Sequence, residues 1–167
     1  KSHVLAKAVL GMEMNCARCH DAPFHPFKQE QLFNLAAMLG RGTQQLPKTS
    51  TIPGGAGALK SDIIKITLKP GDKIAPTWPF SGELQFSLPQ ELVRKSGDTR
   101  EELALRLTLP QNHRTAEVLV NRLWARYFGR GIVEPVDDWE QGTPSHPELL
   151  EYLAREFMAN GYDLKHI

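Results

Sequence analysis

The chain has 167 residues, of which 41% are hydrophobic, so it is long enough to bury a core as one ordinary domain or two small ones. Its 20 Lys and Arg residues balance 19 Asp and Glu residues, which excludes the strong field of one sign that draws a protein to nucleic acid or anionic lipid. No stretch approaches the roughly 20 continuous apolar residues that a bilayer requires. We therefore expect no nucleic-acid partner and no membrane insertion by this segment.

The two ends of the chain indicate a piece of a longer polypeptide. The start, KSHVLAKAVLG, has too short an apolar run for a signal peptide and no initiator Met, and the end, YDLKHI, directly follows a helical pattern. We expect any export signal to lie upstream of Lys1.

The N-terminal segment, residues 1–40, is predicted to be helical. Apolar residues recur at helical spacing over 2–14, which predicts a helix that leads straight into Cys16. After a proline-broken loop, the strong helix formers of 28–39 predict a second helix that Gly40 closes.

The middle of the chain reads as a connector followed by a small strand-containing segment. Residues 41–61 are dense in Gly, Pro, Ser and Thr without any period, which predicts a flexible connector. In the segment 62–97, the sequence DIIKITL (62–68) alternates apolar and polar residues and predicts a strand, and a turn follows at 69–72. Prolines then leave room only for short extended pieces up to Pro89.

The C-terminal segment, residues 98–167, is predicted to hold three helices. Thr99 and Glu102 form a capping box for the first, and Ser145 and Glu148 form another for the last, which should stop at Asn160-Gly161. The middle helix should end at Gly129 and pack through a stripe at i, i+3, i+4 and i+7, made of Val120, Leu123, Trp124 and Tyr127. The expected fold class is mainly α with a small β element: a cytochrome c-like N-terminal helical part and a helical C-terminal part.

The chemistry of the chain is concentrated in CARCH, which holds its only two cysteines. Attachment of haem c needs two thiols, each of which adds to one vinyl group of the porphyrin, and an imidazole just beyond them that ligates the iron. Cys16 and Cys19 supply the thiols, and His20 supplies the axial ligand. The motif therefore predicts a haem c site.

Three other interpretations compete with haem. A Cys-x-x-Cys pair can be a disulfide switch, although such motifs usually open a helix after a strand, and this one follows a predicted helix. Zinc usually needs four ligands, which Cys16, Cys19, His20 and His25 would have to provide. The third interpretation is two unliganded thiols in a loop.

The sixth position on the iron is not fixed by the motif. Met38, on the second predicted helix, is the nearest thioether, although filling the core is the more ordinary role for a methionine there. His25 lies only five residues past His20, which strains the reach of the chain, and His146 beside a helix cap is expected to face solvent or a neighbouring carboxylate. A five-coordinate iron is the remaining option.

A second motif, VNRLWARYFGRGIVEPVDDW, admits a binding or a structural role. Its charged side chains could clamp a sugar or sulfate, or they could be surface charges and ion pairs that brace the turn at 129–131; these are Arg122, Arg126, Arg130, Glu134, Asp137 and Asp138. We favour the structural role, with Asn121 and Arg122 in a buried hydrogen-bond network that fixes the next loop. Arg or Trp side chains from this motif are also candidates for contacts with haem propionates.

Residues 8–39 and 98–167 resemble a known pair of domains. LGMEMNCARCHDAPFHPFKQEQLFNLAAML is similar to the end of the planctomycete-type cytochrome c domain, whose members read as a helix, Cys-x-x-Cys-His-Asp, a Pro-Phe pair, Lys/Gln-Gln-Glu and a further helix. The stretch from Val120 to Ile167 resembles the start of the domain that usually follows it in large surface or periplasmic proteins. The resemblance implies a haem-binding fragment and assigns no reaction. Many members carry a second histidine two residues after the haem histidine, where this chain has Ala22.

Together the motif and the resemblance predict a c-type cytochrome fragment that transfers one electron through a single covalently attached haem. Its expected partner is a redox protein or another domain of the same polypeptide. Haem c is attached outside the cytoplasm and the chain is otherwise poor in cysteine, so we expect an extracytoplasmic location, in the periplasm or at the cell surface. The alternatives are a non-redox module that binds carbohydrate or protein, and a redox domain of a larger enzyme.

Overall fold

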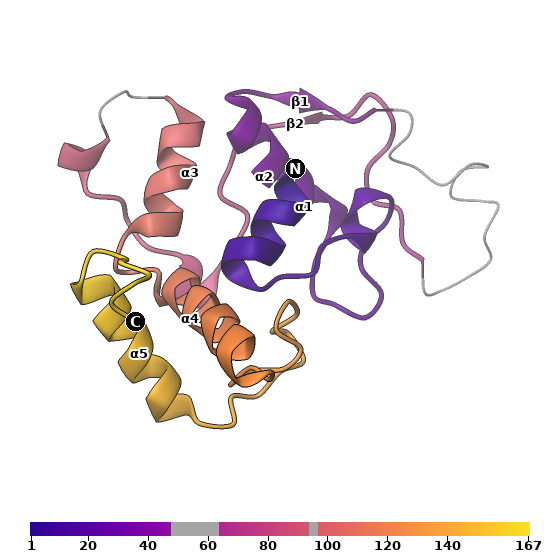
Figure 1. Cartoon of the computed structure of the whole chain (residues 1–167). Coiled ribbons are helices and arrows are strands. Elements are labelled where there is room, and N and C mark those ends of the chain that lie inside the picture. The colour runs from indigo at the N-terminus through magenta and orange to yellow at the C-terminus, as the bar shows by residue number, and fades with distance from the viewer. Residues whose placement is uncertain (48–63, 94–96) are drawn as a thin grey trace. The chain divides into compact units, whose positions relative to one another are not determined.

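The computed structural model describes residues 1–47, 64–93 and 97–167. This part of the chain is mainly helical with one small antiparallel sheet, which confirms the predicted fold class (Figure 1). Within it, no helix combines the length and the apolar character needed to span a bilayer. Residues 48–61 of the predicted connector lie outside the described residues.

The main helices are α2 (Gln29–Gly40), α3 (Thr99–Thr108), α4 (His113–Phe128) and α5 (Pro147–Ala159). The short helical pieces are α1 (Ser2–Leu5), the π-helical turn η1 (Ala6–Leu10) and the 3₁₀ turns η2 (Cys16–Arg18), η4 (Gly82–Leu84) and η5 (Gln90–Leu92). The strands are β1 (Gln44–Gln45) and β2 (Lys73–Ile74). The chain divides into two compact units, the first made of Lys1–His3 and Met14–Leu105, the second of Val4–Glu13 and Arg106–Ile167.

In the first unit, side-chain amides on α2 hold the irregular chain that follows residue 63. Three of them contact backbone groups there: Gln29 Oε1 accepts from the N–H groups of Thr67 and Leu68, Asn34 Nδ2 donates to Ala75 O, and Gln31 Nε2 donates to Pro79 O. These amides satisfy four backbone groups of this stretch that lie outside the short strand β2.

The predicted strand at 62–68 is wrong in its described part, since residues 64–68 pair with no strand. The predicted alternation is nevertheless present, because Leu68 is buried while Lys65 and Thr67 are exposed. The sheet forms elsewhere: β1 and β2 run antiparallel with Gln44 opposite Ile74. Leu46, Leu68 and Ile74 bury a small cluster beside this sheet, and Phe33 of α2 packs against it.

The turn at 69–72 is confirmed. Asp72 Oδ2 accepts a hydrogen bond of 2.7 Å from the backbone N–H of Lys69, and the backbone N–H of Asp72 donates to Lys69 O at 3.0 Å. This closed turn leads directly into β2.

The end of α2 and the start of α3 differ from their predicted caps. The helix α2 includes Gly40, and Arg41 takes the left-handed cap conformation with φ 62°. Asp98, not Thr99, caps α3, because Asp98 Oδ1 accepts from the N–H groups of Arg100 and Glu101. Thr99 Oγ1 donates a hydrogen bond to Met38 O near the C-terminus of α2. The predicted capping box of Thr99 and Glu102 is therefore wrong, because Asp98 is the cap.

In the second unit, α4 and α5 lie side by side (Figure 1). Their core holds nine buried residues: Ala116, Val118, Val120, Ile132, Val133, Trp139, Leu150, Ala154 and Phe157. The predicted end of α4 at Gly129 is confirmed, but the predicted stripe is wrong at Tyr127, whose side chain is 76% exposed.

The last helix ends as predicted, before Asn160, but begins without the predicted capping box. Ser145 Oγ donates to Ile132 O at 3.1 Å, and His146 occupies the N-cap position without a side-chain cap bond. The hydroxyl of Ser145 therefore fixes the preceding loop and does not cap α5.

The N-terminal helix ends earlier than the predicted residue 14. Gly11 takes φ 65° and its N–H donates to Ala6 O, which terminates η1. Residues 12–14 follow without helical structure, so Cys16 begins a separate turn. A tertiary contact fixes this helix end, because the backbone N–H of Trp139 donates to Gly11 O at 2.8 Å within the second unit.

Candidate functional site

The turn η2 gathers the three residues predicted to hold haem. Cys16 begins η2, and its carbonyl accepts from the N–H groups of Cys19 at 3.1 Å and His20 at 3.2 Å. Both cysteines are free, Cys16 exposed and Cys19 half-buried. The thiols and the imidazole therefore lie within one closed turn, and neither sulfur is in a disulfide.

The ring of His20 is oriented by the next peptide. Its Nδ1 lies 2.7 Å from the backbone carbonyl oxygen of Asp21. A carbonyl can only accept, so this hydrogen bond requires a proton on Nδ1 and leaves the lone pair of Nε2 for a metal. Histidines that ligate metals are usually held in this way through the second ring nitrogen.

Asp21 anchors the motif to two other parts of the first unit. Its Oδ1 accepts from the backbone N–H of Gln29 at 2.9 Å, at the start of α2, and from Thr67 Oγ1 at 2.8 Å. Its backbone N–H donates to Lys65 O at 2.8 Å. Residue-by-residue sequence reasoning missed Asp21, although the family pattern Cys-x-x-Cys-His-Asp carries the signal for it.

The loop after the motif is closed by the N–H of Ala22, which donates to Phe27 O at 2.8 Å. Within it, His25 is half-buried and stacks on Phe27, with ring centroids 6.3 Å apart. Phe24 is 75% exposed. His25 is therefore fixed against an aromatic ring on its own loop.

Met38 is fully buried on α2. It lies nine residues beyond Gln29, roughly 13 Å along the helix axis, and its carbonyl accepts from Thr99. This position is that of a core residue, which is the more ordinary role expected for a methionine there.

Across the described residues, no group of three or more His, Cys, Asp and Glu side chains is arranged to hold a metal ion. A structural zinc site usually takes four protein ligands. The residues do fit haem c, which asks of the protein two accessible thiols and one oriented imidazole, and η2 with His20 provides these.

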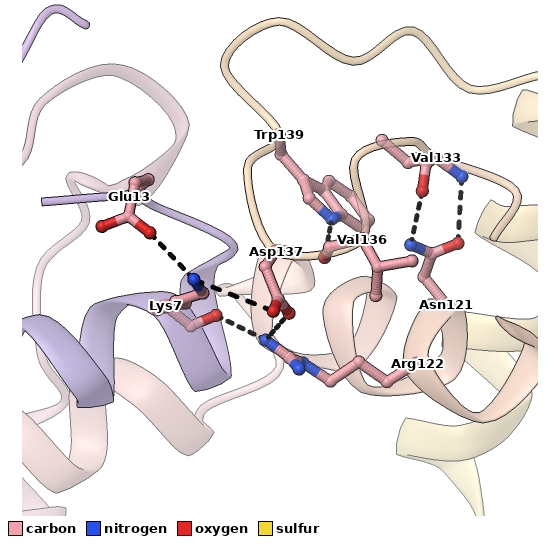
Figure 2. A network of polar contacts seen from close by, with 8 residues as sticks. All are labelled: Lys7, Glu13, Asn121, Arg122, Val133, Val136, Asp137 and Trp139. Atoms are coloured by element: carbon pink, nitrogen blue, oxygen red, sulfur yellow. Dashed lines mark hydrogen bonds and ion pairs between the residues drawn. The ribbon is translucent and has the colours of Figure 1, made fainter. Parts of the chain in front are cut away.

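A second polar cluster lies in the second unit and joins the N-terminal helix to the loop after α4 (Figure 2). Arg122 Nη2 donates to Lys7 O at 2.8 Å and lies 2.7 Å from Asp137 Oδ1. Lys7 Nζ donates to Glu13 Oε2 at 2.9 Å, and this hydrogen bond is the main cause of the raised pKa of Lys7. The cluster holds backbone as well as side chains in place.

Asn121 forms the buried centre of the same region. Its side-chain Nδ2 donates to Val133 O at 3.0 Å and its Oδ1 accepts from Val133 N at 2.9 Å, as Figure 2 shows. Glu134 Oε1 accepts from the N–H of Gly131 and braces the turn. These contacts confirm the structural role predicted for Asn121 and Arg122. Arg126 and Arg130 from the same motif are exposed.

Comparisons with known proteins place two different families on the two ends of the chain. Residues 1–44 match the family PSCyt2, described as Protein of unknown function (DUF1549). Residues 99–167 match the family PSD1, described as Protein of unknown function (DUF1553). No curated protein and no solved structure matches the chain. The chain therefore joins a PSCyt2 segment to a PSD1 segment, the planctomycete-type domain pair that its sequence resembles.

Proposed function

We propose that the PSCyt2 segment is a one-electron carrier that binds a single haem c through Cys16 and Cys19, with His20 as an axial ligand. The observation that carries this proposal is the contact of 2.7 Å between His20 Nδ1 and Asp21 O, because it leaves Nε2 as the ring nitrogen available to iron.

The chain's own residues would do three things for the cofactor. The exposed thiol of Cys16 at the start of η2 and the half-exposed thiol of Cys19 at its C-cap provide attachment points without a deep pocket. His20 provides the iron ligand, and Asp21 fixes its ring. Haem c, when bound, supplies an iron that accepts and releases one electron.

The electron partner in this proposal is a redox protein or another domain of the same polypeptide, and the location is extracytoplasmic. The proposed location follows from the proposed cofactor, because haem c is attached outside the cytoplasm. The partner within the same polypeptide is supported by the two family segments that the chain carries in succession.

The test is expression of the chain with and without the haem c attachment machinery. We expect intact-mass spectrometry to show one covalent haem, and the reduced protein to show the absorption spectrum of a c-type cytochrome, only with the machinery. Cys16→Ala combined with Cys19→Ala should abolish the covalent mass, and His20→Ala should alter the axial-ligand spectrum. His25→Ala is the matched control, because it removes the other imidazole of the same region and should leave both signals unchanged. A folded chain that carries no covalent haem after expression with the attachment machinery overturns the proposal.

A second candidate function comes from the exposed end of α4. Tyr127 and Phe128 are 76% and 67% exposed, and the ring of Phe128 contacts that of Trp124 in a tilted arrangement, with ring centroids 4.3 Å apart. Arg126 and Arg130 are exposed around them. This surface suits binding of an acidic carbohydrate, with aromatic faces for the sugar ring and guanidinium groups for its anions. An array of acidic glycans tests it: binding lost in Tyr127→Ala supports this function, and no binding by the wild-type chain removes it.

A further inference from the structure

We infer that Asp21 is the positioning residue for His20: its carboxylate locks the peptide whose carbonyl selects the His20 tautomer. The inference rests on the proposed function for its consequence at the iron, but the positioning itself is a property of the chain without haem.

The first step of the argument is the hydrogen bond at His20. Free imidazole in water exchanges readily between its two neutral tautomers, so a single acceptor beside one nitrogen is enough to choose between them. Asp21 O is that acceptor, at 2.7 Å from Nδ1. Its direction depends on the backbone torsion angles of Asp21, which in a free loop would vary. The N–H of the same peptide, that of Ala22, donates to Phe27 O at 2.8 Å, and the contacts of the Asp21 side chain fix the other side of these torsions.

The second step is that Asp21 is held at three points. Its Oδ1 accepts from Gln29 N and Thr67 Oγ1, and its backbone N–H donates to Lys65 O. Hydrogen bonds to a carboxylate are about twice as strong as those between neutral groups. The carboxylate also lies at the N-terminus of α2, where the helix dipole favours a negative charge.

The third step is that these anchors belong to elements far apart in the sequence. Gln29 begins α2, and Thr67 lies in the stretch that Gln29 Oε1 also holds through the N–H groups of Thr67 and Leu68. Asp21 and Gln29 therefore tie together the motif, the helix and this stretch. The orientation of one imidazole is set by the tertiary structure of the first unit and not by the CARCH sequence alone.

At the iron, a hydrogen bond donated by Nδ1 makes the imidazole a stronger electron donor, which lowers the reduction potential. Loss of the Asp21 anchor should weaken this bond. The potential should then rise while the covalent attachment through Cys16 and Cys19 remains.

The experiment compares four full-length chains: wild type, Asp21→Ala, Asp21→Asn and Asp72→Ala. Asp21→Asn keeps an oxygen acceptor at the same place. Asp72→Ala is the matched control, because Asp72 also accepts from a backbone N–H, that of Lys69, but closes the separate turn at 69–72. The first readout is ¹⁵N NMR of the ring nitrogens of His20 without haem, at a pH where the ring is neutral.

We expect the wild type and Asp72→Ala to hold the proton on Nδ1, Asp21→Asn to keep most of this preference, and Asp21→Ala to show a mixture of tautomers. In haem-loaded protein at equal covalent haem content, Asp21→Ala should shift the midpoint potential upward, and Asp72→Ala should not. A residue that only stabilises the loop would lower the unfolding temperature without moving either signal in the folded chain.

An unchanged His20 tautomer in folded Asp21→Ala overturns the inference. If that variant does not fold, Thr67→Val removes one of the two donors to Oδ1 at an exposed site and should shift the tautomer ratio in the same direction by a smaller amount; no shift there also overturns it. If Asp21→Ala shifts the His20 tautomer but the wild-type chain attaches no haem even with the attachment machinery, the proposed function fails and the positioning role stands.

Discussion

The indole of Trp139 lies against Gly11, and the backbone N–H of Trp139 donates to Gly11 O at 2.8 Å. A Cβ added at Gly11 would lie 2.7 Å from Cδ1 of Trp139, which is closer than real Cβ atoms approach. Trp139 is only 8% exposed and its Nε1 donates to Val136 O, so the ring has little freedom to retreat. A stretch that matches PSCyt2 thus contributes a closely packed element to the unit that holds most of PSD1.

Gly11→Ala should therefore destabilise the second unit more than Gly129→Ala. Both glycines have a left-handed backbone, with φ 65° and 76°, but nothing lies within 4 Å of an added Cβ at Gly129. The backbone penalty alone should cost Gly129→Ala about 1–2 kcal/mol of unfolding free energy. Crowding against the indole should cost Gly11→Ala about 1–3 kcal/mol more. Chemical denaturation of both variants measures the difference, and equal losses would show that the ring moves aside freely.

Asn121→Ala should be among the most damaging substitutions in the second unit. It leaves both backbone groups of buried Val133 without their partners, and the loss of unfolding free energy should be about 2–4 kcal/mol. Asn160→Ala is the control, because its Nδ2 donates to Glu156 O at an exposed position, and it should change the unfolding free energy by only about 0.5 kcal/mol. Similar losses in the two variants would contradict the role assigned to Asn121.

Lys7→Met and Arg122→Met should separate ion pairing from backbone anchoring. The side chain of Lys7 is 37% exposed, so removal of its charge should cost less than about 1 kcal/mol. Arg122 donates to the backbone carbonyl of Lys7 as well as pairing with Asp137, so its loss should cost about 1.5–3 kcal/mol. Thermal unfolding at low and at 0.5 M salt checks the distinction, because only the ion-pair contribution should weaken as salt is added; a larger effect for Lys7→Met would reverse the assignment.

Asp98 should contribute to the pH dependence of stability. The backbone N–H of Glu101 is the main cause that lowers the pKa of Asp98 below its model-compound value of 3.8, and Arg41 and the N–H of Arg100 act in the same direction. A folded-state pKa below the unfolded one means that this contribution is complete above pH 3.8 and is lost as the pH falls through the folded-state pKa. Asp98→Asn keeps an oxygen at the cap but has no charge to titrate. The stability difference between wild type and Asp98→Asn should be constant near neutral pH and shrink in acid; a difference that persists unchanged would refute this.

Met38→Leu should leave the axial-ligand spectrum of the haem-loaded chain unchanged. Met38 is fully buried on α2, and leucine is close to it in volume, so folding should be retained with a loss below about 1.5 kcal/mol. The measurement is the optical and paramagnetic resonance spectrum at equal haem content. A changed spectrum would instead identify Met38 as the sixth ligand.

The sequence predicted the elements whose signals are local. The helices α2, α4 and α5 and the stops at Gly129 and Asn160 are confirmed, because each depends on residues within one helix. The predicted caps failed at Ser145 and Thr99, since each hydroxyl bonds to a carbonyl of another segment, Ile132 and Met38. A capping motif in sequence gives the right donors and acceptors but does not reveal such competing partners.

The sequence by itself determined the chemistry: two thiols and an imidazole in CARCH, the balanced charge and the alternation of residues 64–68, because residue type and spacing are written directly in it. Only the tertiary structure decided how His20 is held, where the N-terminal helix ends and which backbone groups α2 satisfies. Those outcomes depend on three hydrogen bonds, between Asp21 and Thr67, Gly11 and Trp139, and Gln29 and Leu68. The residues in these pairs are 39 to 128 positions apart in the chain. Only the folded chain brings such residues together, and no local sequence pattern predicts these contacts.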